Sequence, residues 1–291
     1  MESDFRKIKF CLVGLGLMGG SYAKALRKIG VKQIQGIDIN HKTLEQALEN
    51  GIIDIAAAEG DNRLADADVI ILSLPRAASI SFVKAYTSYF KPTVLITDVS
   101  GIKGDLQGEI KPLLSKHMDF VSGHPMAGRE GSGFNQSQAG IFVGANYIVV
   151  SDRANSPGNV TWLHDFAKAL GCATVTVVSA VEHDRLIAYT STLPHVLAVA
   201  LVNSESMEKR TKKFIAGSFR DATRVADING PLWTELMMEN RENILAEIEK
   251  FKRSLQAIEK TLISRNTAEL MDLLDQAACR RKDLMDEKDH C

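Results

Sequence analysis

Hydrophobic residues in the first half of the chain fall into short runs that alternate with helical patterns. Runs rich in β-branched residues predict strands over residues 7–13, 33–37, 69–74, 94–99 and 120–122. Strands that are apolar on both faces and separated by helices belong to parallel sheets that are covered on both sides. The pattern therefore predicts an α/β fold with a doubly wound, Rossmann-like parallel sheet.

The second half of the chain has a different pattern. Residues 147–150 and 173–178 predict two more strands, after which apolar residues recur at helical spacing, as in the long amphipathic stretch 243–263. We place a dinucleotide-binding domain at residues 1–179 and an all-helical domain at residues 180–291. A long helix with a broad apolar stripe often buries it against another subunit, so we expect a homodimer.

Composition and charge narrow the possible partners. The 291 residues include 35 Lys plus Arg and 36 Asp plus Glu, so the net charge of −1 does not favour nucleic acid or an anionic membrane as a partner. Four dispersed cysteines without a CxxC pair indicate neither a zinc site nor a disulfide framework, and we expect no metal. We find no signal-peptide core and no apolar stretch long enough to span a membrane, and expect a soluble, cytoplasmic protein.

A glycine motif follows the first predicted strand directly. In GLGLMGGS, Gly14 allows a tight turn, Gly16 lets the backbone approach a pyrophosphate, and Gly19 lets helix and strand pack closely. A helical pattern over residues 22–28 follows at once, and its N-terminus is expected to face the phosphates, with Leu17 and Met18 as further candidate cofactor contacts. Strand, glycines, helix and second strand arrive in order, which favours a cofactor site over an ordinary turn.

The end of the second strand predicts which dinucleotide binds. Asp38 lies 24 residues after Gly14, where its carboxylate can accept hydrogen bonds from both ribose hydroxyls and would repel a 2′-phosphate. This favours NAD over NADP. The alternative, that Asp38 caps the next helix, is weaker because Asn40 can serve as the cap. Turns after the following strands are expected to line the nicotinamide half of the site, through Ser73, Leu74, Pro75 and Asp98.

A histidine at the same sheet edge is the candidate base. His124 directly follows the predicted strand 120–122, within GHPMAGRE. An imidazole titrates near neutral pH and can take a proton from an alcohol while hydride leaves the carbon. A histidine in a loop is more often structural, but its place at the cofactor edge favours catalysis here.

Two motifs in the helical half carry further candidates. His195 ends TSTLPH inside the apolar helical stretch 186–202, where Pro194 is expected to kink the helix; the alternative is a core histidine bonded to a carbonyl. In GSFRDATRVA, Arg220 and Arg224 are expected on one helical face, suited to binding a carboxylate. The alternative for these arginines is a surface salt bridge.

The ordered set of motifs resembles one enzyme family. GLGLMGGS, HPMAGREGSG, the Leu-Pro-His helix and FRDATRVA followed by Pro-Leu-Trp are similar to the prephenate dehydrogenases of tyrosine biosynthesis, over most of residues 8–245. Each motif alone has modest specificity, whereas their order is specific.

The resemblance implies an activity and residue roles. It implies NAD-dependent oxidative decarboxylation of prephenate to 4-hydroxyphenylpyruvate, with arogenate or dual-specificity cyclohexadienyl dehydrogenase as the alternative. By resemblance, His124 accepts a hydrogen bond from the ring hydroxyl, Arg224 binds a substrate carboxylate and His195 positions the substrate. A β-hydroxyacid dehydrogenase using a lysine such as Lys103 would not explain His124. A redox-sensing regulator is disfavoured by the lack of a basic recognition element.

The sequence departs from the family at several positions. Many relatives have a serine where this chain has Gly101, so Ser100 is the candidate for that catalytic hydroxyl. Arg129 stands where smaller residues are common and is a candidate substrate contact. Glu130 is another, either for the ammonium group of arogenate or for ordering a gate. Relatives often have a histidine in place of Thr192.

Overall fold

The computed structural model describes residues 4–128 and 131–284. By its internal contacts the chain divides into two compact units, residues 1–240 and residues 241–291. The first unit holds both sheets, and the second holds the last two helices of the described chain.

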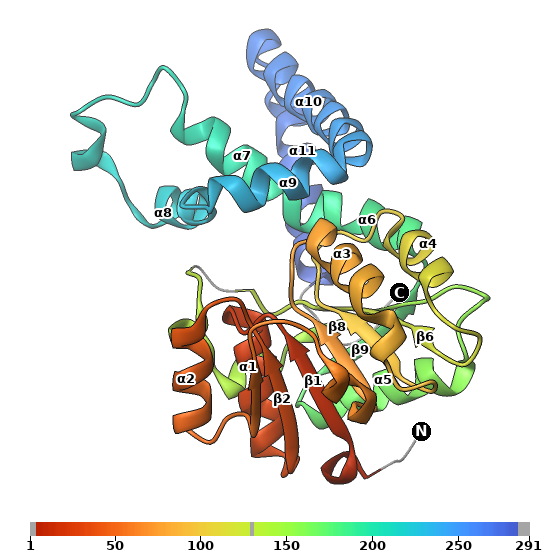
Figure 1. Cartoon of the computed structure of the whole chain (residues 1–291). Helices are drawn as coiled ribbons and strands as arrows, with labels where there is room; N and C mark the ends of the chain where they lie inside the picture. Colours follow the sequence, from red (N-terminus) through yellow and green to blue (C-terminus); the bar gives the residue numbers. More distant parts are fainter. Residues whose placement is uncertain (1–3, 129–130, 285–291) are drawn as a thin grey trace. The chain divides into compact units, whose positions relative to one another are not determined.

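A six-stranded parallel sheet forms the centre of the first unit (Figure 1). Its strands, in spatial order, are β3 (Ile55–Ala57), β2 (Gln33–Ile37), β1 (Lys9–Val13), β4 (Val69–Leu72), β5 (Leu95–Asp98) and β6 (Asp119–Phe120). The Rossmann-like parallel sheet predicted from the apolar runs is confirmed. The prediction missed β3, because three residues at a sheet edge are too few to show a periodic pattern.

A second, three-stranded sheet follows. Strand β7 (Ser122–Pro125) runs antiparallel to β8 (Asn146–Val150), and β8 runs parallel to β9 (Thr174–Val178). The predicted single strand 120–122 is wrong, because the chain leaves the first sheet after Phe120 and begins the second at Ser122. Gly123 permits this crossing, since a Cβ there would lie 2.2 Å from the hydroxyl of Tyr147.

Helices cover both faces of the parallel sheet. One buried cluster packs α1 (Leu17–Lys28), α2 (His41–Glu49) and α5 (Pro157–Ala169) against one face, and the other packs α3 (Arg76–Tyr86) and α4 (Leu106–Ile110) against the opposite face. Side chains of β1 alternate between the clusters, Phe10 and Leu12 in one, Cys11 and Val13 in the other. Each face of the strand is therefore buried, as its continuous apolar run predicted.

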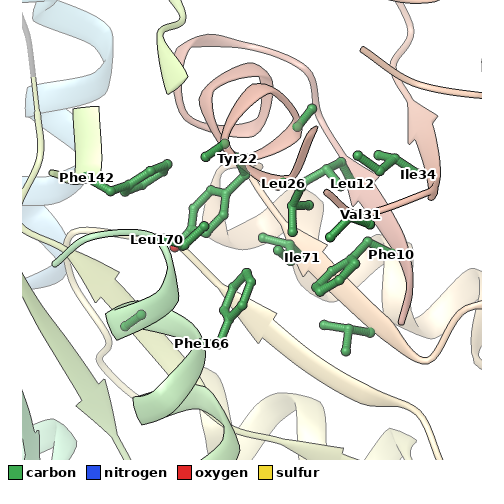
Figure 2. Packing of buried hydrophobic residues seen from close by; sticks show 14 of the residues in the cluster. Phe10, Leu12, Tyr22, Leu26, Val31, Ile34, Ile71, Phe142, Phe166 and Leu170 are labelled. Atoms are coloured by element: carbon green, nitrogen blue, oxygen red, sulfur yellow. The ribbon is translucent and has the colours of Figure 1, made fainter. Parts of the chain in front are cut away.

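Aromatic side chains, among them Phe10, Tyr22, Phe142 and Phe166, pack with aliphatic ones in the larger cluster, as Figure 2 shows. The ring of Phe166 stacks on Trp162 with centroids 5.1 Å apart and on Phe10 at 5.5 Å. The hydroxyls of Tyr22 and Tyr147 are 3.2 Å apart, so the first helix and the second sheet share a buried hydrogen bond. This contact links the two sheets through one core.

After β9 the described chain is helical. It contains α6 (Ala180–Ile187), a π-helical segment (Ala188–Thr192), α7 (Leu193–Val202), α8 (Gly217–Thr223) and α9 (Gly230–Glu239). Pro194 lies in the first turn of α7, where a missing N–H is tolerated, and the irregularity falls in the π-helical segment just before it. Arg220 and Arg224 do not share one helical face as predicted, because α8 ends at Thr223 and Arg224 begins a 3-10 turn (Arg224–Ala226).

The second unit contains two helices. Helix α10 (Arg241–Ser264) contains the long amphipathic stretch predicted from the sequence, and α11 (Thr267–Asp283) follows. Arg265 has φ 52° and Asn266 caps α11 by accepting the N–H of Glu269, which reverses the chain between them.

One helical stretch is longer than expected from the sequence, in which we found no apolar stretch long enough to span a membrane. Residues Ala180–Val202, which continue through α6, the π-helical segment and α7, are long and apolar enough to cross a membrane by length and composition. Length and composition are weak evidence, since the core helix of a soluble protein passes the same test, and this one carries the buried polar residues His183 and Asp184.

Candidate active site

Strand register brings the candidate loops to one edge of the sheet. Val13 pairs with Ile37 and Leu72, and Leu72 pairs with Asp98. The segments that follow these four strands therefore begin side by side at the carboxyl edge, where doubly wound sheets bind their ligands.

The three glycines of the motif differ in their surroundings. Gly14 has φ +86°, and a Cβ there would lie 2.6 Å from the carbonyl oxygen of Ser73. A Cβ on Gly19 would lie 1.8 Å from the carbonyl oxygen of Gly14, so no larger residue fits. By contrast, a Cβ on Gly16 would meet no described protein atom within 4 Å. The second glycine thus opens the backbone to a ligand, whereas the first and third close the turn.

The N-terminus of α1 points out of this turn. Gly16 is its N-cap residue and supplies no side-chain hydrogen bond, so the N–H groups of Leu17 and Met18 lack an intrahelical acceptor. Such groups bind phosphate oxygens well, because the helix dipole adds positive potential at the same end.

Asp38 stands beside the turn and is itself held in place. Its carboxylate accepts the N–H of Leu15 at 2.7 Å and that of Asn40 at 2.8 Å. Asn40, not Asp38, caps α2, since its side chain accepts the N–H groups of Lys42 and Thr43. Asp38 is half-buried, and Ile39 next to it is 91% exposed. The oriented carboxylate and the apolar side chain together suit the adenosine end of a dinucleotide.

The loop after β4 carries an unsatisfied hydroxyl. Ser73 Oγ is buried and has no hydrogen-bond partner in the described chain, although buried hydroxyls are normally paired. It lies against the turn, since a Cβ on Gly19 would be 3.1 Å from Ser73 Cβ. Leu74 follows half-buried, and the exposed Pro75 precedes α3. An open glycine, free helical N–H groups and an orphaned hydroxyl fit a dinucleotide at this edge.

Asp98 faces the interior instead of the open edge. It is 1% exposed and one oxygen accepts Lys103 Nζ at 2.8 Å and the N–H of Ser100 at 2.9 Å. The other accepts the Ser122 hydroxyl and the N–H of Gly123 at 3.2 Å. Burial alone would raise the pKa of Asp98, but Lys103 and the hydroxyl donors outweigh it and lower the pKa. The carboxylate of Asp98 is therefore occupied by groups inside the protein, and its expected contact with the nicotinamide half stays a prediction.

Ser100 shares in the same network. Its hydroxyl donates to Asp98 and lies 3.0 Å from the carbonyl oxygen of Ile102, and none of its hydrogen bonds in the described chain involves His124. Gly101 lies beside the base, since a Cβ there would be 3.9 Å from His124 Nε2. The catalytic role expected for Ser100 stays a prediction.

His124 lies within β7 and its imidazole is bonded to a second histidine. His124 Nδ1 is 2.8 Å from His183 Nε2, and His183 Nδ1 is 2.6 Å from an oxygen of Asp184. Burial lowers the pKa of His124 well below its usual 6.5, and Lys103 and His183 lower it further, while Asp98 opposes them. His124 is therefore a neutral imidazole at neutral pH.

A cavity of about 390 Å³ opens in front of His124. The predicted substrate residues His195 and Arg224 also line it, so the structure brings these three together. The ring of His195 stacks on Trp233 with centroids 3.7 Å apart, and its Nδ1 donates to the carbonyl oxygen of Ser191 in the π-helical segment at 2.8 Å. The remaining lining includes Met126, Asp227, Asn229 and Leu232.

Two predicted residues cannot be placed. Arg129 and Glu130 lie outside the described residues. Within residues 4–128 and 131–284, no group of three or more His, Cys, Asp or Glu side chains is arranged to hold a metal ion.

Sequence reasoning missed His183, Asp184 and Asp227. The only signal for the first two is an adjacent His-Asp pair, but the same pair occurs as His164–Asp165, whose side chains are 38% and 62% exposed. Burial separates the pairs, and burial of a polar pair at the start of a helix is not visible in the sequence. Asp227 follows FRDATRVA directly, but nothing in the sequence places it in a cavity.

Comparison with known proteins gives matches over both halves of the chain. The family model of the prephenate dehydrogenase nucleotide-binding domain matches residues 22–176, and that of the prephenate dehydrogenase dimerization domain matches residues 179–276. The chain is 31% identical to the prephenate dehydrogenase of Bacillus subtilis over 264 residues, which cover 89% of this chain and 71% of the relative.

Two further proteins are similar over nearly the whole chain. The cyclohexadienyl dehydrogenase of Zymomonas mobilis is 27% identical over 284 residues, 96% of each chain. The crystal structure of prephenate dehydrogenase from A. aeolicus in complex with hydroxyphenyl propionate and NAD+ superposes with a TM-score of 0.86 and 29% identity, covering 95% of this chain and 98% of that one.

The glycine turn can be tested with two matched substitutions. Gly16→Ala should leave the melting temperature unchanged, because its methyl group meets no protein atom, yet weaken NAD binding by about tenfold or more, the effect of losing ~1.4 kcal/mol. Gly19→Ala should lower both stability and binding, because its methyl group collides with the Gly14 carbonyl. Calorimetric titration and thermal melting measure the pair. Equal NAD affinity in wild type and Gly16→Ala would contradict the assignment.

Proposed function

Because the chain belongs to the prephenate dehydrogenase family, we propose that it oxidises and decarboxylates prephenate to 4-hydroxyphenylpyruvate with NAD as the hydride acceptor. The observation that carries this proposal is the position of His124. It lies within β7, at the edge where the dinucleotide turn opens, and it also lines the cavity that contains Arg224 and His195.

The reaction balances without an external acid or base. A C–H bond of the ring carbinol breaks and its electron pair leaves as hydride, the C–C bond to the ring carboxylate breaks to release CO2, and the ring becomes aromatic. The hydroxyl proton that a base takes during oxidation returns to the ring oxygen, which ends as a phenol. The protein therefore needs a group that accepts this proton transiently, and a neutral imidazole suits that task.

His124 supports this role through its free nitrogen. Its Nδ1 is occupied by His183, so Nε2 is the nitrogen available to a substrate hydroxyl. Arg224 supplies a guanidinium that can bind a carboxylate with two parallel hydrogen bonds. His195, stacked on Trp233, gives the cavity a flat wall against which a six-membered ring can lie.

The residues at the carboxyl edge of the parallel sheet can be assigned to the parts of NAD that they would bind. Gly14, Gly16 and Gly19 with the N–H groups of Leu17 and Met18 would hold the pyrophosphate, Asp38 the ribose hydroxyls, and Ser73, Leu74 and Pro75 the nicotinamide half. When bound, NAD supplies the hydride acceptor. The carboxylate of Asp38 disfavours the 2′-phosphate of NADP.

A second candidate substrate is favoured by Asp227. This carboxylate lines the same cavity as Arg224, and an ammonium group would be attracted to it. Arogenate differs from prephenate in carrying an amino group on the side chain, so we keep arogenate or dual specificity as the alternative. The similarity to a cyclohexadienyl dehydrogenase supports it as well.

We also propose the wider organisation of the protein. Residues 1–179 would bind the dinucleotide, and residues 180–291 would bind substrate and form a homodimer, which the dimerization-domain match at residues 179–276 supports. Exposed Leu255, Leu262 and Ile263 on α10 offer apolar surface for it. The net charge of −1 supports the absence of nucleic-acid and anionic-membrane partners, and we propose a soluble, cytoplasmic enzyme.

Replacing the base tests the proposed activity. His124→Asn should still bind NAD but should lower kcat with prephenate by about 10²-fold or more, because no neighbouring group takes the hydroxyl proton. NADH absorbance measures turnover, and NAD titration of the variant is the control. Wild-type kcat in the variant would remove His124 from the mechanism, and no NADH formation by wild type with either substrate would refute the function.

The pH profile tests the state of His124. Its lowered pKa means that the neutral, accepting imidazole persists as the pH falls below the usual 6.5. The kcat/KM for prephenate should therefore stay level at pH 6.5 and fall only at lower pH. An acid limb with its midpoint above 6.5 would contradict a base desolvated by burial and placed near Lys103.

Substrate preference can be tested at Asp227. Asp227→Asn should raise the KM for arogenate several-fold and leave the KM for prephenate unchanged or lower, because only arogenate carries an ammonium group. Steady-state assays with both substrates and both nicotinamide cofactors measure the difference. Unchanged arogenate KM in the variant would assign Asp227 no part in specificity.

A further inference from the structure

Three side chains form a hydrogen-bonded chain behind the cavity. Asp184 accepts from His183 Nδ1 at 2.6 Å, and His183 Nε2 is 2.8 Å from His124 Nδ1. His183 is 1% exposed and Asp184 6% exposed, so bulk water does not compete for these bonds. The chain runs from helix α6 to strand β7, and only its last member lines the cavity.

The carboxylate of Asp184 determines which ring nitrogens of His183 and His124 carry a hydrogen. A carboxylate oxygen can only accept, so the Nδ1 of His183 carries the hydrogen. A neutral His183 then has a bare Nε2, which must accept from His124, so His124 carries its hydrogen on Nδ1. The Nε2 of His124 is therefore bare, and it is the nitrogen beside Gly101.

We propose that His183 is a positioning residue that holds His124 in the tautomer whose bare Nε2 faces the substrate hydroxyl, with Asp184 as the anchor of the chain. The catalytic step rests on the proposed function, whereas the assignment of the tautomer does not. During the step the substrate O–H bond breaks and an N–H bond forms at Nε2. The Nδ1–H of His124 stays bonded to His183, which stabilises the resulting imidazolium until the proton returns to the ring oxygen.

The anchor is itself rigidly held. Asp184 accepts the N–H groups of Lys103 and Gly104 at 2.9 and 2.7 Å, and its own carbonyl accepts the side-chain amide of Asn240 at 2.8 Å. Burial alone would raise the pKa of Asp184, but His183 and the two N–H donors outweigh it, so the carboxylate is ionised at neutral pH. Because this acceptor is ionised at neutral pH, it keeps the direction of the two hydrogen bonds fixed.

Burial, helped by Lys103, keeps both imidazoles neutral before substrate arrives. Lys103 and Asp98 are the other charged groups that act on the two rings. Burial lowers the pKa of His183, and Lys103 adds to this, while Asp184 and Asp98 oppose it. With both rings neutral, the tautomers follow from Asp184 alone.

Two substitutions of His183 separate positioning from packing. In His183→Gln, the side-chain amide oxygen can take the place of Nε2 and accept from His124 Nδ1, so kcat should stay within about tenfold of wild type. In His183→Leu a residue of similar bulk cannot accept, so kcat should fall by roughly 10²-fold while the affinity for NAD is kept. The matched control is His164→Leu, which removes the exposed histidine of the other His-Asp pair and should leave kcat unchanged.

The tautomer can be observed without turnover. Two-bond ¹⁵N–¹H correlation spectra of enzyme labelled at histidine nitrogens distinguish a protonated ring nitrogen from a bare one, and the His124→Asn spectrum identifies the signals of His124. Wild type and His183→Gln should show a protonated Nδ1 and a bare Nε2, whereas His183→Leu should show a mixture with protonated Nε2.

Each outcome bears on the proposal. A wild-type spectrum with protonated Nε2 on His124, or His183→Leu with wild-type kcat and an unchanged spectrum, would overturn it. Equal losses of kcat in His183→Gln and His183→Leu with unchanged His124 signals would likewise reduce His183 to packing. If His183→Leu does not fold, the wild-type spectrum alone decides. An inactive wild type that shows the expected tautomer would refute the proposed function and leave the positioning intact.

Discussion

A buried ion pair between Asp98 and Lys103 fixes the geometry around His124. Both side chains are 2% exposed, and removing one partner of such a pair typically destabilises a fold by about 3–5 kcal/mol, because the other charge stays buried. Asp98 ends β5 and accepts from Ser122 and Gly123, while Lys103 donates to the carbonyl oxygen of Gly123 at 2.7 Å. The residue before His124 is thus held from both sides, and the two sheets meet at this point.

This arrangement joins two half-sites that the chain builds separately. The parallel sheet supplies the open turn at Gly16 and the oriented carboxylate of Asp38, whereas the helical segments supply Arg224 and the stacked pair of His195 and Trp233. The family models likewise divide the chain into a nucleotide-binding domain and a dimerization domain. In the proposed function the hydride acceptor lies at the sheet edge and a small dianion in the cavity, with the neutral imidazole of His124 between them.

The sequence predicted the parts whose chemistry is local. The glycine turn and the capping role of Asn40 depend on neighbouring residues, the strands of the parallel sheet show as continuous apolar runs, and all are found. The interior role of Asp98 was not predictable, because a carboxylate at a strand end can face a ligand or a buried lysine. His183 and Asp184 were not predicted, because His124, to which His183 bonds, lies 59 residues away from it. The predicted shared helical face of Arg220 and Arg224 was wrong, because the end of α8 at Thr223 has no sequence signal. Local sequence patterns therefore do not predict side-chain partners that are far apart in the sequence, or where a helix ends.

A crystal structure of the enzyme with NAD and 4-hydroxyphenylpyruvate would test the account most directly. We predict the phenol oxygen within about 2.6–3.2 Å of His124 Nε2, the side-chain carboxylate at Arg224, and the ring between His124 and the nicotinamide. A product ring bound away from His124, or a His124 that has turned to place Nδ1 toward the phenol, would contradict it.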